Sequence, residues 1–278
     1  MTDNQNLPVV ILCGGRGTRI RDVADDIPKP MIRIGGKPIL WHIMKTYSFF
    51  GFRRFILCLG YKGYVIKEYF ANYGLHEKDV TIRLGLPQEL VFHGSTDEDD
   101  WEITLVETGL YSETGSRIRQ ALRYVDSDIF MMSYGDGLGN INIHELLAFH
   151  RTNPGLVTLT AADRPASRFG EIDFDGNRIT QFSEKKLLRN QSPINAGYMV
   201  MDRGIDEYIA DDTSSDLETD VLPACARDNL LYMYRHKGFR HPMDTYKDWE
   251  YLTRLWESGS APWKVWKDES SSRGGRCK

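Results

Sequence analysis

Residues 9–19 read VVILCGGRGTR, and Lys29 follows ten residues after Arg19, between Pro28 and Pro30. The four apolar residues that open this stretch predict a buried strand that runs directly into a glycine-rich turn. Glycines after a strand allow the backbone to approach an anion closely, and their N–H groups can form a concave nest of donors. Arg19 and Lys29 add positive charge, and the two prolines exclude a helix around Lys29. The stretch therefore predicts a phosphate-binding site.

The glycine spacing alone does not identify the ligand. It matches neither a Walker A loop nor the three-glycine fingerprint of dinucleotide-binding folds. A tight surface turn with two solvated cations is the alternative interpretation, and the other motifs of the chain must decide between the two.

The composition is that of a globular protein. The chain has 278 residues, of which 41% are hydrophobic. This suffices for one large α/β domain or for a domain with an appended lobe. The formal net charge of −4 argues against a nucleic acid as partner, so we expect any basic cluster to serve a small anion.

Cysteine usage and the N-terminal residues indicate the compartment. None of the cysteines has metal-ligand spacing, which predicts free thiols in a reducing compartment. Residues 1–7 are polar and unlike a signal sequence, and no apolar run approaches the ~20 residues of a membrane helix. We therefore expect a cytoplasmic protein that does not contact a membrane. The cysteines are Cys13, Cys58, Cys225 and Cys277.

Strands and helices alternate through the first half of the chain. Residues 54–59 form a second apolar run, and residues 38–50 and 64–70 carry apolar side chains at helical spacing. This alternation predicts a doubly wound, mostly parallel α/β sheet with right-handed crossovers. Ligands of such sheets bind beyond the carboxyl ends of the strands, where the glycine turn lies.

Two segments interrupt the alternation. Residues 84–101 include four consecutive acidic residues, 97–100, and predict an exposed loop or arm with a solvated charge run. Residues 169–182 contain two strand-like runs around a turn, and predict an antiparallel hairpin insertion. We expect helices again in the C-terminal part, and residues 267–278 predict a disordered tail.

Two aspartates follow predicted strands at distant points of the chain. Asp136 lies between Gly135 and Gly137 after the apolar run 129–133, and Asp244 lies in the sequence PMDT. Mg²⁺ binds one or two carboxylates and completes its shell with phosphate and water, so this pair is sufficient for one ion. The alternative for Asp136 alone is a turn-capping role. Cations and paired carboxylates are together what polyphosphate chemistry requires.

From residue 9 to residue 266 the sequence resembles the sugar-1-phosphate nucleotidyltransferases, and within this family the branch of the glucose-1-phosphate cytidylyltransferases. The resemblance implies a Rossmann-like fold in a single domain over residues 1–266. It implies a nucleotide-binding part over about 8–162 and a sugar-binding part over about 163–266. The motifs that carry it are GGRGTR (14–19), PKPM (28–31), GKPILWHIMK (36–45), GYKG (60–63), YGDG (134–137), RFG (168–170), EK (184–185), INAG (194–197), PMDT (242–245) and APWKVW (261–266).

The resemblance implies the reaction of an NTP with a sugar 1-phosphate to give an NDP-sugar and pyrophosphate, with CTP and glucose 1-phosphate as the expected pair. A phosphate monoester is mostly dianionic at neutral pH because its second pKa is near ~6, so the attacking oxygen needs no general base. The implied catalytic set is Arg19 on the β- and γ-phosphates, Lys29 on the α-phosphate and Asp136. Mg²⁺ would bind Asp136 and Asp244.

The resemblance also implies the binding residues. A carboxylate such as Glu107 can accept from the amino group of cytosine, and Arg117 is expected on the nucleotide phosphates. The implied nucleotide-binding residues are Leu12, Gly14, Gly15, Gly17, Thr18, Arg19, Lys29, Glu107, Thr108, Gly109, Thr114, Gly115, Arg117 and Asp136. The implied sugar-phosphate residues are Gly170, Glu184, Lys185, Asn195 and Asp244.

Some positions depart from the glucose-specific pattern, namely Arg33, Glu171, Lys186 and the segment 187–193. These departures leave open a different sugar 1-phosphate, with GTP or another NTP, in a specialised pathway. A non-catalytic nucleotide-binding paralogue is a third hypothesis, but the implied catalytic set is intact. The arm at 84–101 and the aromatic C-terminal part suggest surfaces for a homo-oligomer.

Overall fold

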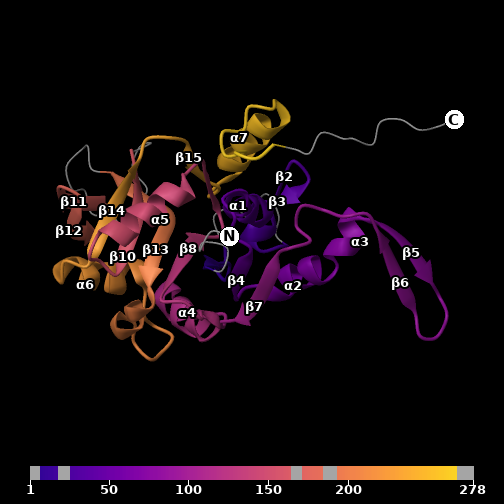
Figure 1. The fold of residues 1–278 in the computed structure, drawn as a ribbon, viewed down its shortest axis with the longest axis horizontal. Coiled ribbons are helices and arrows are strands. Elements are labelled where there is room, and N and C mark those ends of the chain that lie inside the picture. The colour runs from indigo at the N-terminus through magenta and orange to yellow at the C-terminus, as the bar shows by residue number, and fades with distance from the viewer. Residues whose placement is uncertain (1–6, 18–25, 164–170, 184–192, 268–278) are drawn as a thin grey trace.

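A computed structural model describes residues 7–17, 26–163, 171–183 and 193–267 of the chain. Its main strands are β1 Pro8–Leu12, β4 Arg54–Leu59, β7 Glu102–Glu107, β8 Ile129–Tyr134, β10 Val157–Ala162, β11 Glu171–Asp175, β12 Arg178–Ser183, β13 Ile194–Asp202 and β14 Leu231–His236. In the described residues these strands form one nine-stranded sheet with the order β10-β14-β12-β11-β13-β8-β1-β4-β7 (Figure 1). Strands β8, β1, β4 and β7 are parallel neighbours. The predicted doubly wound, mostly parallel sheet is confirmed.

Helices connect the parallel strands, as the alternation predicts. The helices are α1 Ile39–Phe49, α2 Gly63–Ala71, α3 Tyr73–Glu77, α4 Thr114–Ala121, α5 Ile143–Thr152, α6 Leu222–Arg227 and α7 Tyr246–Glu257. Short helical turns cover Lys29–Met31, Leu122–Tyr124, Arg203–Tyr208 and Leu217–Val221. Within the described ranges the fold also contains three small antiparallel pairs: β2 Arg33–Ile34 with β3 Lys37–Pro38, β5 Asp79–Arg83 with β6 Glu89–His93, and β9 Gly137–Gly139 with β15 Arg240–Pro242.

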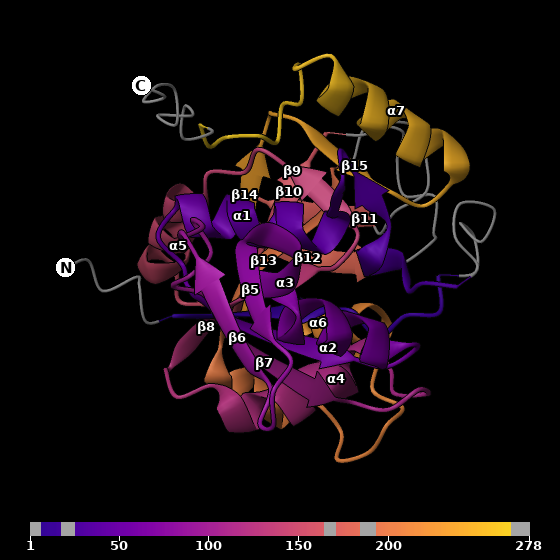
Figure 2. The same cartoon turned by 90° about the vertical axis from the view of Figure 1, so that its right-hand side faces the viewer.

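The side chains of β1 alternate between two hydrophobic cores. Val9 and Ile11 join a cluster that includes residues of α1 and α7, whereas Val10 joins a cluster that includes residues of α4 and α6. Figure 2 shows α7 at one side of the sheet and α4 at the other. A strand that is covered on both faces needs apolar side chains in both directions, which explains why β1 is an uninterrupted apolar run.

The hairpin β11–β12 connects two parts of the sheet. Glu171 of β11 pairs with Ile194 of β13, and Arg178 of β12 pairs with Tyr232 of β14. The turn between the two strands contains Gly176 with a φ of +61°, a conformation that favours glycine. The predicted antiparallel hairpin insertion is confirmed.

The arm differs from the prediction in its secondary structure. Residues 89–93 form β6, which pairs antiparallel with β5 over five residue pairs from Asp79–His93 to Arg83–Glu89. This two-stranded hairpin extends away from the body of the molecule (Figure 1). The polar composition around residues 95–100 obscured the short strand that precedes it.

The prediction of a solvated acidic run holds for Asp97, Asp99 and Asp100, whose side chains are 44%, 43% and 59% exposed, but not for Glu98. Nζ of Lys45 donates to Asp97 at 2.8 Å and to Glu98 at 2.5 Å, and the side chains of Lys45 and Glu98 are each only 8% exposed. Asp99 pairs with Lys78 and Asp100 with Arg53, each at 2.6 Å. The reason is that Lys45 lies on the buried side of α1 and needs a counter-charge, because a buried ammonium without a partner is costly.

Two further expectations concern compartment. Cys13, Cys58 and Cys225 are buried free thiols within the described part of the chain, and Cys277 lies outside it. Burial raises the pKa of Cys58 and Cys225 to about 12, so these thiols are unreactive at neutral pH. In the ranges that the structure describes, no helix is both long enough and apolar enough to cross a membrane.

Candidate active site

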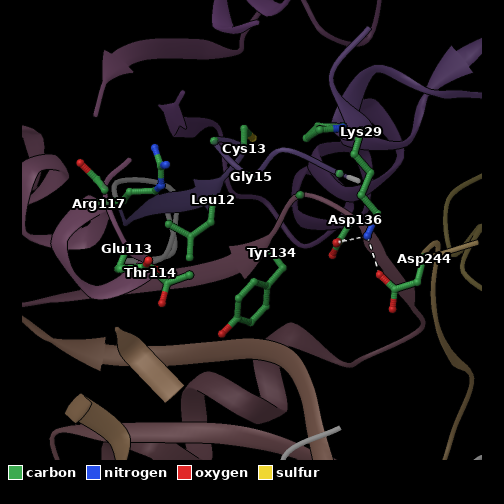
Figure 3. A pocket seen from close by; sticks show the side chains of 15 residues that line it. Leu12, Cys13, Gly15, Lys29, Glu113, Thr114, Arg117, Tyr134, Asp136 and Asp244 are labelled. Carbon is green, nitrogen blue, oxygen red and sulfur yellow. Dashed lines mark hydrogen bonds and ion pairs between the residues drawn. The ribbon is translucent and has the colours of Figure 1, made fainter. Parts of the chain in front are cut away.

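A cavity of about 360 Å³ opens beyond the carboxyl ends of β1 and β8 (Figure 3). This is the edge at which doubly wound sheets bind ligands. Its walls come from the glycine turn, the Lys29 segment, the start of α4, the end of β8 and the segment after β15. The lining residues are Leu12, Cys13, Gly14, Gly15, Gly17, Lys29, Pro30, Ser112, Glu113, Thr114, Arg117, Tyr134, Gly135, Asp136 and Asp244.

The glycine turn excludes side chains at two positions. Gly17 has a φ of +57°, and a Cβ there would lie 3.0 Å from Cβ of Lys29. A Cβ on Gly14 would overlap the guanidinium of Arg117. The backbone of the turn therefore passes closely between Lys29 and Arg117, which is what a main-chain phosphate site requires.

Lys29 connects the two predicted metal ligands. Its Nζ donates to Oδ2 of Asp136 at 2.5 Å and to Oδ1 of Asp244 at 2.6 Å (Figure 3). The side chain is 12% exposed. Burial alone would lower the pKa of Lys29, but the two carboxylates outweigh it and raise this pKa above the ordinary 10.5. Lys29 is therefore a fixed positive charge at the cavity wall.

The backbone brings Asp136 and Asp244 together from distant parts of the chain. Gly137 of β9 pairs with Pro242 of β15, and N–H of Met243 donates to the carbonyl of Asp136 at 2.9 Å. On the other side, the carboxylate of Asp248 accepts from the N–H of Asp244 at 3.0 Å and caps α7. The pairing of two short strands thus fixes both carboxylates beside Lys29.

Arg117 supports the other end of the cavity. Its side chain is buried, and its Nη1 donates to Oγ1 of Thr108 at 2.7 Å, to the carbonyl of Gly109 at 2.8 Å and to that of Leu59 at 3.1 Å. Burial lowers the pKa of this guanidinium. In this structure Arg117 holds the segment 108–109 in place from behind, and its role toward nucleotide phosphates stays a prediction.

Thr114, the first residue of α4, is held by an acidic segment. Its hydroxyl lies 3.1 Å from Oδ2 of Asp216 and 3.0 Å from Oε2 of Glu218, and it accepts from the N–H of Leu217 at 2.8 Å. Burial raises the pKa of Glu218. A Cβ on Gly115 would lie 2.8 Å from the carbonyl of Ser215, so the start of α4 packs directly on this segment.

The cavity gathers most of the described residues that the sequence assigned to the nucleotide and the metal. Glu107, Thr108, Gly109, Gly115 and Asn195 do not line it. Oε1 of Glu107 instead pairs with Nζ of Lys67 at 2.6 Å, and Oδ1 of Asn195 accepts from the N–H of Gly197 at 2.8 Å. The predicted residues in the cavity wall are Leu12, Gly14, Gly15, Gly17, Lys29, Thr114, Arg117, Asp136 and Asp244. Those outside the described residues are Thr18, Arg19, Gly170, Glu184 and Lys185.

Several residues of the cavity were missed by the sequence interpretation. Tyr134 and Gly135 belong to the quoted motif YGDG, and a Cβ on Gly135 would lie 2.9 Å from the carbonyl of Leu12. The buried hydroxyl of Tyr134 has no hydrogen-bond partner among the described residues. Glu113 precedes the start of α4, and this position was the available signal. The missed residues are Cys13, Pro30, Ser112, Glu113, Tyr134 and Gly135.

The donor set at Lys29 fits a divalent cation. Asp136 and Asp244 already converge on one cationic atom, Nζ of Lys29. No group of three or more His, Cys, Asp or Glu side chains in the described part of the chain could hold a metal ion. An ion at these two carboxylates would therefore take its other ligands from phosphate oxygens and water, as Mg²⁺ commonly does.

Residues 8–268 match the nucleotidyl transferase family. The match spans nearly the whole chain, including the glycine turn, Lys29 and both aspartates. The chain therefore belongs to this family, and the resemblance seen in the sequence is confirmed.

Named relatives and solved structures agree with the family. The chain is 43% identical over 262 residues to a glucose-1-phosphate cytidylyltransferase of Salmonella typhi, which covers 94% of this chain and 100% of the relative. It is 41% identical to a probable glucose-1-phosphate cytidylyltransferase of Bacillus subtilis, with 94% and 100% covered. The inositol-1-phosphate CTP transferase of T. maritima superposes with a TM-score of 0.72 at 17% identity, with 96% and 100% covered. At that identity the likeness shows the fold alone.

Proposed function

We propose that this protein transfers the cytidylyl group of CTP to glucose 1-phosphate and releases pyrophosphate. Identity of 43% to a glucose-1-phosphate cytidylyltransferase over the full length of that relative supports the substrate pair. The observation that carries the proposal is the cluster of Lys29, Asp136 and Asp244 beside a glycine turn at the carboxyl edge of the sheet. It combines a fixed cation, two carboxylates and main-chain N–H groups in one cavity.

The proposed reaction exchanges one bond to phosphorus for another. An oxygen of the glucose 1-phosphate attacks the α-phosphorus of CTP in line, and the bond to the β-phosphate oxygen breaks, so that CDP-glucose and pyrophosphate form. The attacking phosphate is mostly dianionic at neutral pH. Catalysis then depends on holding two anions together and on stabilising negative charge on the transferred and leaving oxygens.

Lys29 supplies positive charge at the transferred phosphorus in this proposal. Its Nζ leaves the carboxylates of Asp136 and Asp244 and donates to an α-phosphate oxygen when CTP enters. The N–H groups of the glycine turn bind the other phosphates, together with Arg19, whose role rests on the resemblance. Lys185 is proposed on the phosphate of the sugar, with Gly170, Glu184 and Asn195 around the sugar.

Asp136 and Asp244 would hold a Mg²⁺ ion, which would neutralise phosphate charge and align the two substrates when bound. The pairing of β9 with β15 keeps the two carboxylates close together with or without substrate. The contact of the Asp248 carboxylate with the N–H of Asp244 holds the backbone of Asp244 in place.

We also propose the remaining organisation by the same resemblance. Residues 8–162 would form the nucleotide-binding part and residues 163–266 the sugar-binding part of a single domain. The arm β5–β6, with Leu84 85% exposed and Leu86 fully exposed, would contact a second copy of the chain in a homo-oligomer. The three buried thiols agree with a reducing compartment, so the cytoplasm is the proposed location.

A substrate panel tests the proposal. The purified protein with Mg²⁺ is incubated with CTP, UTP, GTP or dTTP and with glucose 1-phosphate or mannose 1-phosphate, and pyrophosphate and NDP-sugar are quantified. We expect the highest kcat/KM for CTP with glucose 1-phosphate, and loss of product in Asp136→Asn. A higher value for another pair would refute the substrate assignment and favour the alternative that Arg33 and Glu171 left open. No product from any pair would refute nucleotidyl transfer.

A further inference from the structure

The two ends of the cavity differ in their charged groups. Lys29, Asp136 and Asp244 lie at one end, and Glu113, Thr114 and Arg117 lie at the other (Figure 3). The glycine turn passes between them, with Gly17 against Lys29 and Gly14 against Arg117. A ligand that fills the cavity therefore meets Lys29 with its two aspartates at one end, and Glu113 with Arg117 at the other.

The carboxylate of Glu113 is exposed, and its charge acts on Arg117 and Glu218 without direct pairing. It makes no hydrogen bond or ion pair with any residue that the structure describes, and it does not cap α4 although it directly precedes that helix. The backbone of Glu113 is nevertheless fixed. Its N–H donates to the carbonyl of Thr213 at 2.9 Å, and its carbonyl accepts from the N–H of Arg117 at 3.0 Å. A fixed backbone thus places an acceptor that has no protein hydrogen-bond partner among the described residues in the wall of the cavity.

Electrostatics restricts what Glu113 can face. Asp136 and Asp244 are neutralised by Lys29 and, in the proposed function, by a bound Mg²⁺ ion, so the phosphates of a bound nucleotide would occupy the end with Lys29 and the glycine N–H groups. At the other end Glu113 repels phosphate, and the guanidinium of Arg117 donates to Leu59, Thr108 and Gly109. The uncharged part of the nucleotide, the base with its ribose, then occupies the end that contains Glu113. An ionised carboxylate has only acceptor positions, so it favours ligand groups that donate.

Nucleobases differ in whether they offer a donor. Cytosine carries an amino group at C4, whereas uracil carries a carbonyl oxygen there, which a carboxylate would repel. Leaving a polar group of the site unpaired strongly penalises the wrong substrate. A single carboxylate at this position can therefore separate CTP from UTP.

We infer that Glu113 determines base specificity by accepting a hydrogen bond from the amino group of cytosine. This inference rests on the proposed function and adds a residue to it. Glu107, which the sequence suggested for this role, is paired with Lys67 at 2.6 Å and does not line the cavity. Glu113 replaces it because it lies in the wall and its carboxylate is unpaired.

The ratio of kcat/KM for CTP to kcat/KM for UTP, with glucose 1-phosphate as the second substrate, tests this inference. It is measured for the wild type, for Glu113→Gln, for Glu107→Gln and for the control Glu102→Gln, an exposed glutamate elsewhere on β7. The amide of Glu113→Gln can donate to the C4 carbonyl of uracil, so we expect the ratio to fall at least tenfold. The ratio in Glu102→Gln should stay within twofold of the wild type.

Two results would overturn the inference. One is an unchanged ratio in Glu113→Gln, which includes an equal fall for both nucleotides, and the other is a change of the ratio in Glu107→Gln instead. Because the comparison is a ratio, a general loss of active protein cancels.

The proposed function can fail separately from this inference. If the wild type forms no product with either nucleotide, the dissociation constants of CTP and UTP are measured by calorimetry on the same proteins. A tenfold fall in the preference for CTP in Glu113→Gln would support the role of Glu113 in binding, and an unchanged preference would overturn it.

Discussion

Lys29 and Lys45 each hold an ammonium between two carboxylates. Lys29 is 12% exposed and lies 2.5 and 2.6 Å from its partners, Asp136 and Asp244, whereas Lys45 is 8% exposed and lies 2.8 and 2.5 Å from Asp97 and Glu98. The pairs differ in what surrounds them. Lys29 lines a cavity beside glycine N–H groups, while Lys45 is packed beneath the arm, with its Nζ 5.5 Å from the ring centre of Trp41.

This comparison shows that a buried ion pair does not by itself mark an active site. An ion pair in the wall of a cavity can exchange partners, because its ammonium and its carboxylates can bind groups of a ligand that enters the cavity. An ion pair that is enclosed by packed side chains meets no ligand, and it links one segment of the fold to another. The predictions below therefore treat Lys29 as an exchangeable cation and Lys45 as a structural one.

The largest expected difference is in turnover. Lys29→Met should lower kcat for CTP and glucose 1-phosphate by about a thousandfold, because its charge is needed most where negative charge redistributes in the transition state. Lys45→Met should leave kcat within threefold of the wild type. Steady-state pyrophosphate release measures both variants.

The free energy of unfolding should fall more in the Lys45 variant than in the Lys29 variant. Removal of one partner of a buried pair costs roughly 3–5 kcal/mol, and Lys45→Met leaves Glu98 buried without a counter-charge, so its unfolding free energy should fall by about that amount. Denaturant unfolding of folded samples measures it. A stable Lys45→Met, or full activity in Lys29→Met, would remove the distinction between the two lysines.

The two aspartates beside Lys29 should act as one unit. Asp136→Asn and Asp244→Asn should each lower kcat by at least about a hundredfold, with little further loss in the double variant, because each residue depends on the other to hold a cation. All three variants are assayed at one temperature, and circular dichroism measures the folded fraction of each, so that loss of folded protein is not mistaken for loss of turnover. Losses that multiply in the double variant would contradict a shared site.

The variants of Lys29 and Lys45 should also differ in metal affinity without nucleotide, by a smaller factor than in kcat. Lys29→Gln removes the cation that stands between the two carboxylates, so Mn²⁺ should bind at least tenfold more tightly without nucleotide, about 1.4 kcal/mol. Lys45→Gln should bind Mn²⁺ like the wild type. Electron paramagnetic resonance of free Mn²⁺ measures this, and equal affinity in all three proteins would show that Lys29 does not compete with a metal.

The pH dependence of the unfolding free energy should depend on the region around Lys45 and not on the cavity at Lys29. Burial lowers the pKa of His42, on the same helix as Lys45, from 6.5 to about 4. The folded state then binds fewer protons than the unfolded state, so the unfolding free energy should fall as pH decreases from about 6.5 to about 4, by roughly 3 kcal/mol in total. His42→Gln should lose this part of the pH dependence, whereas His76→Gln, at an exposed position, should keep it. An unchanged pH profile in His42→Gln would contradict the assignment.

The sequence predicted the sheet and the phosphate end of the site because their signals are local. An apolar run followed by glycines and a lysine between prolines determines backbone conformation over a few residues. The burial of Glu98 within the acidic run 97–100 was not predicted, because its partner Lys45 is about fifty residues away and carries no local sign of burial. Glu113 was missed because its position before α4 is a weak signal, and the three-dimensional wall of the cavity is what separates it from Glu107.

A crystal structure with a bound, non-reactive CTP analogue and Mg²⁺ tests the exchange at Lys29 most directly. We predict that the phosphates lie on the N–H groups of Gly14, Gly15 and Gly17, and that Nζ of Lys29 has left both carboxylates and lies about 3 Å from an α-phosphate oxygen. The ammonium of Lys45 should remain between Asp97 and Glu98. An analogue bound elsewhere, or a Lys29 that stays between Asp136 and Asp244 with the nucleotide in place, would contradict the account.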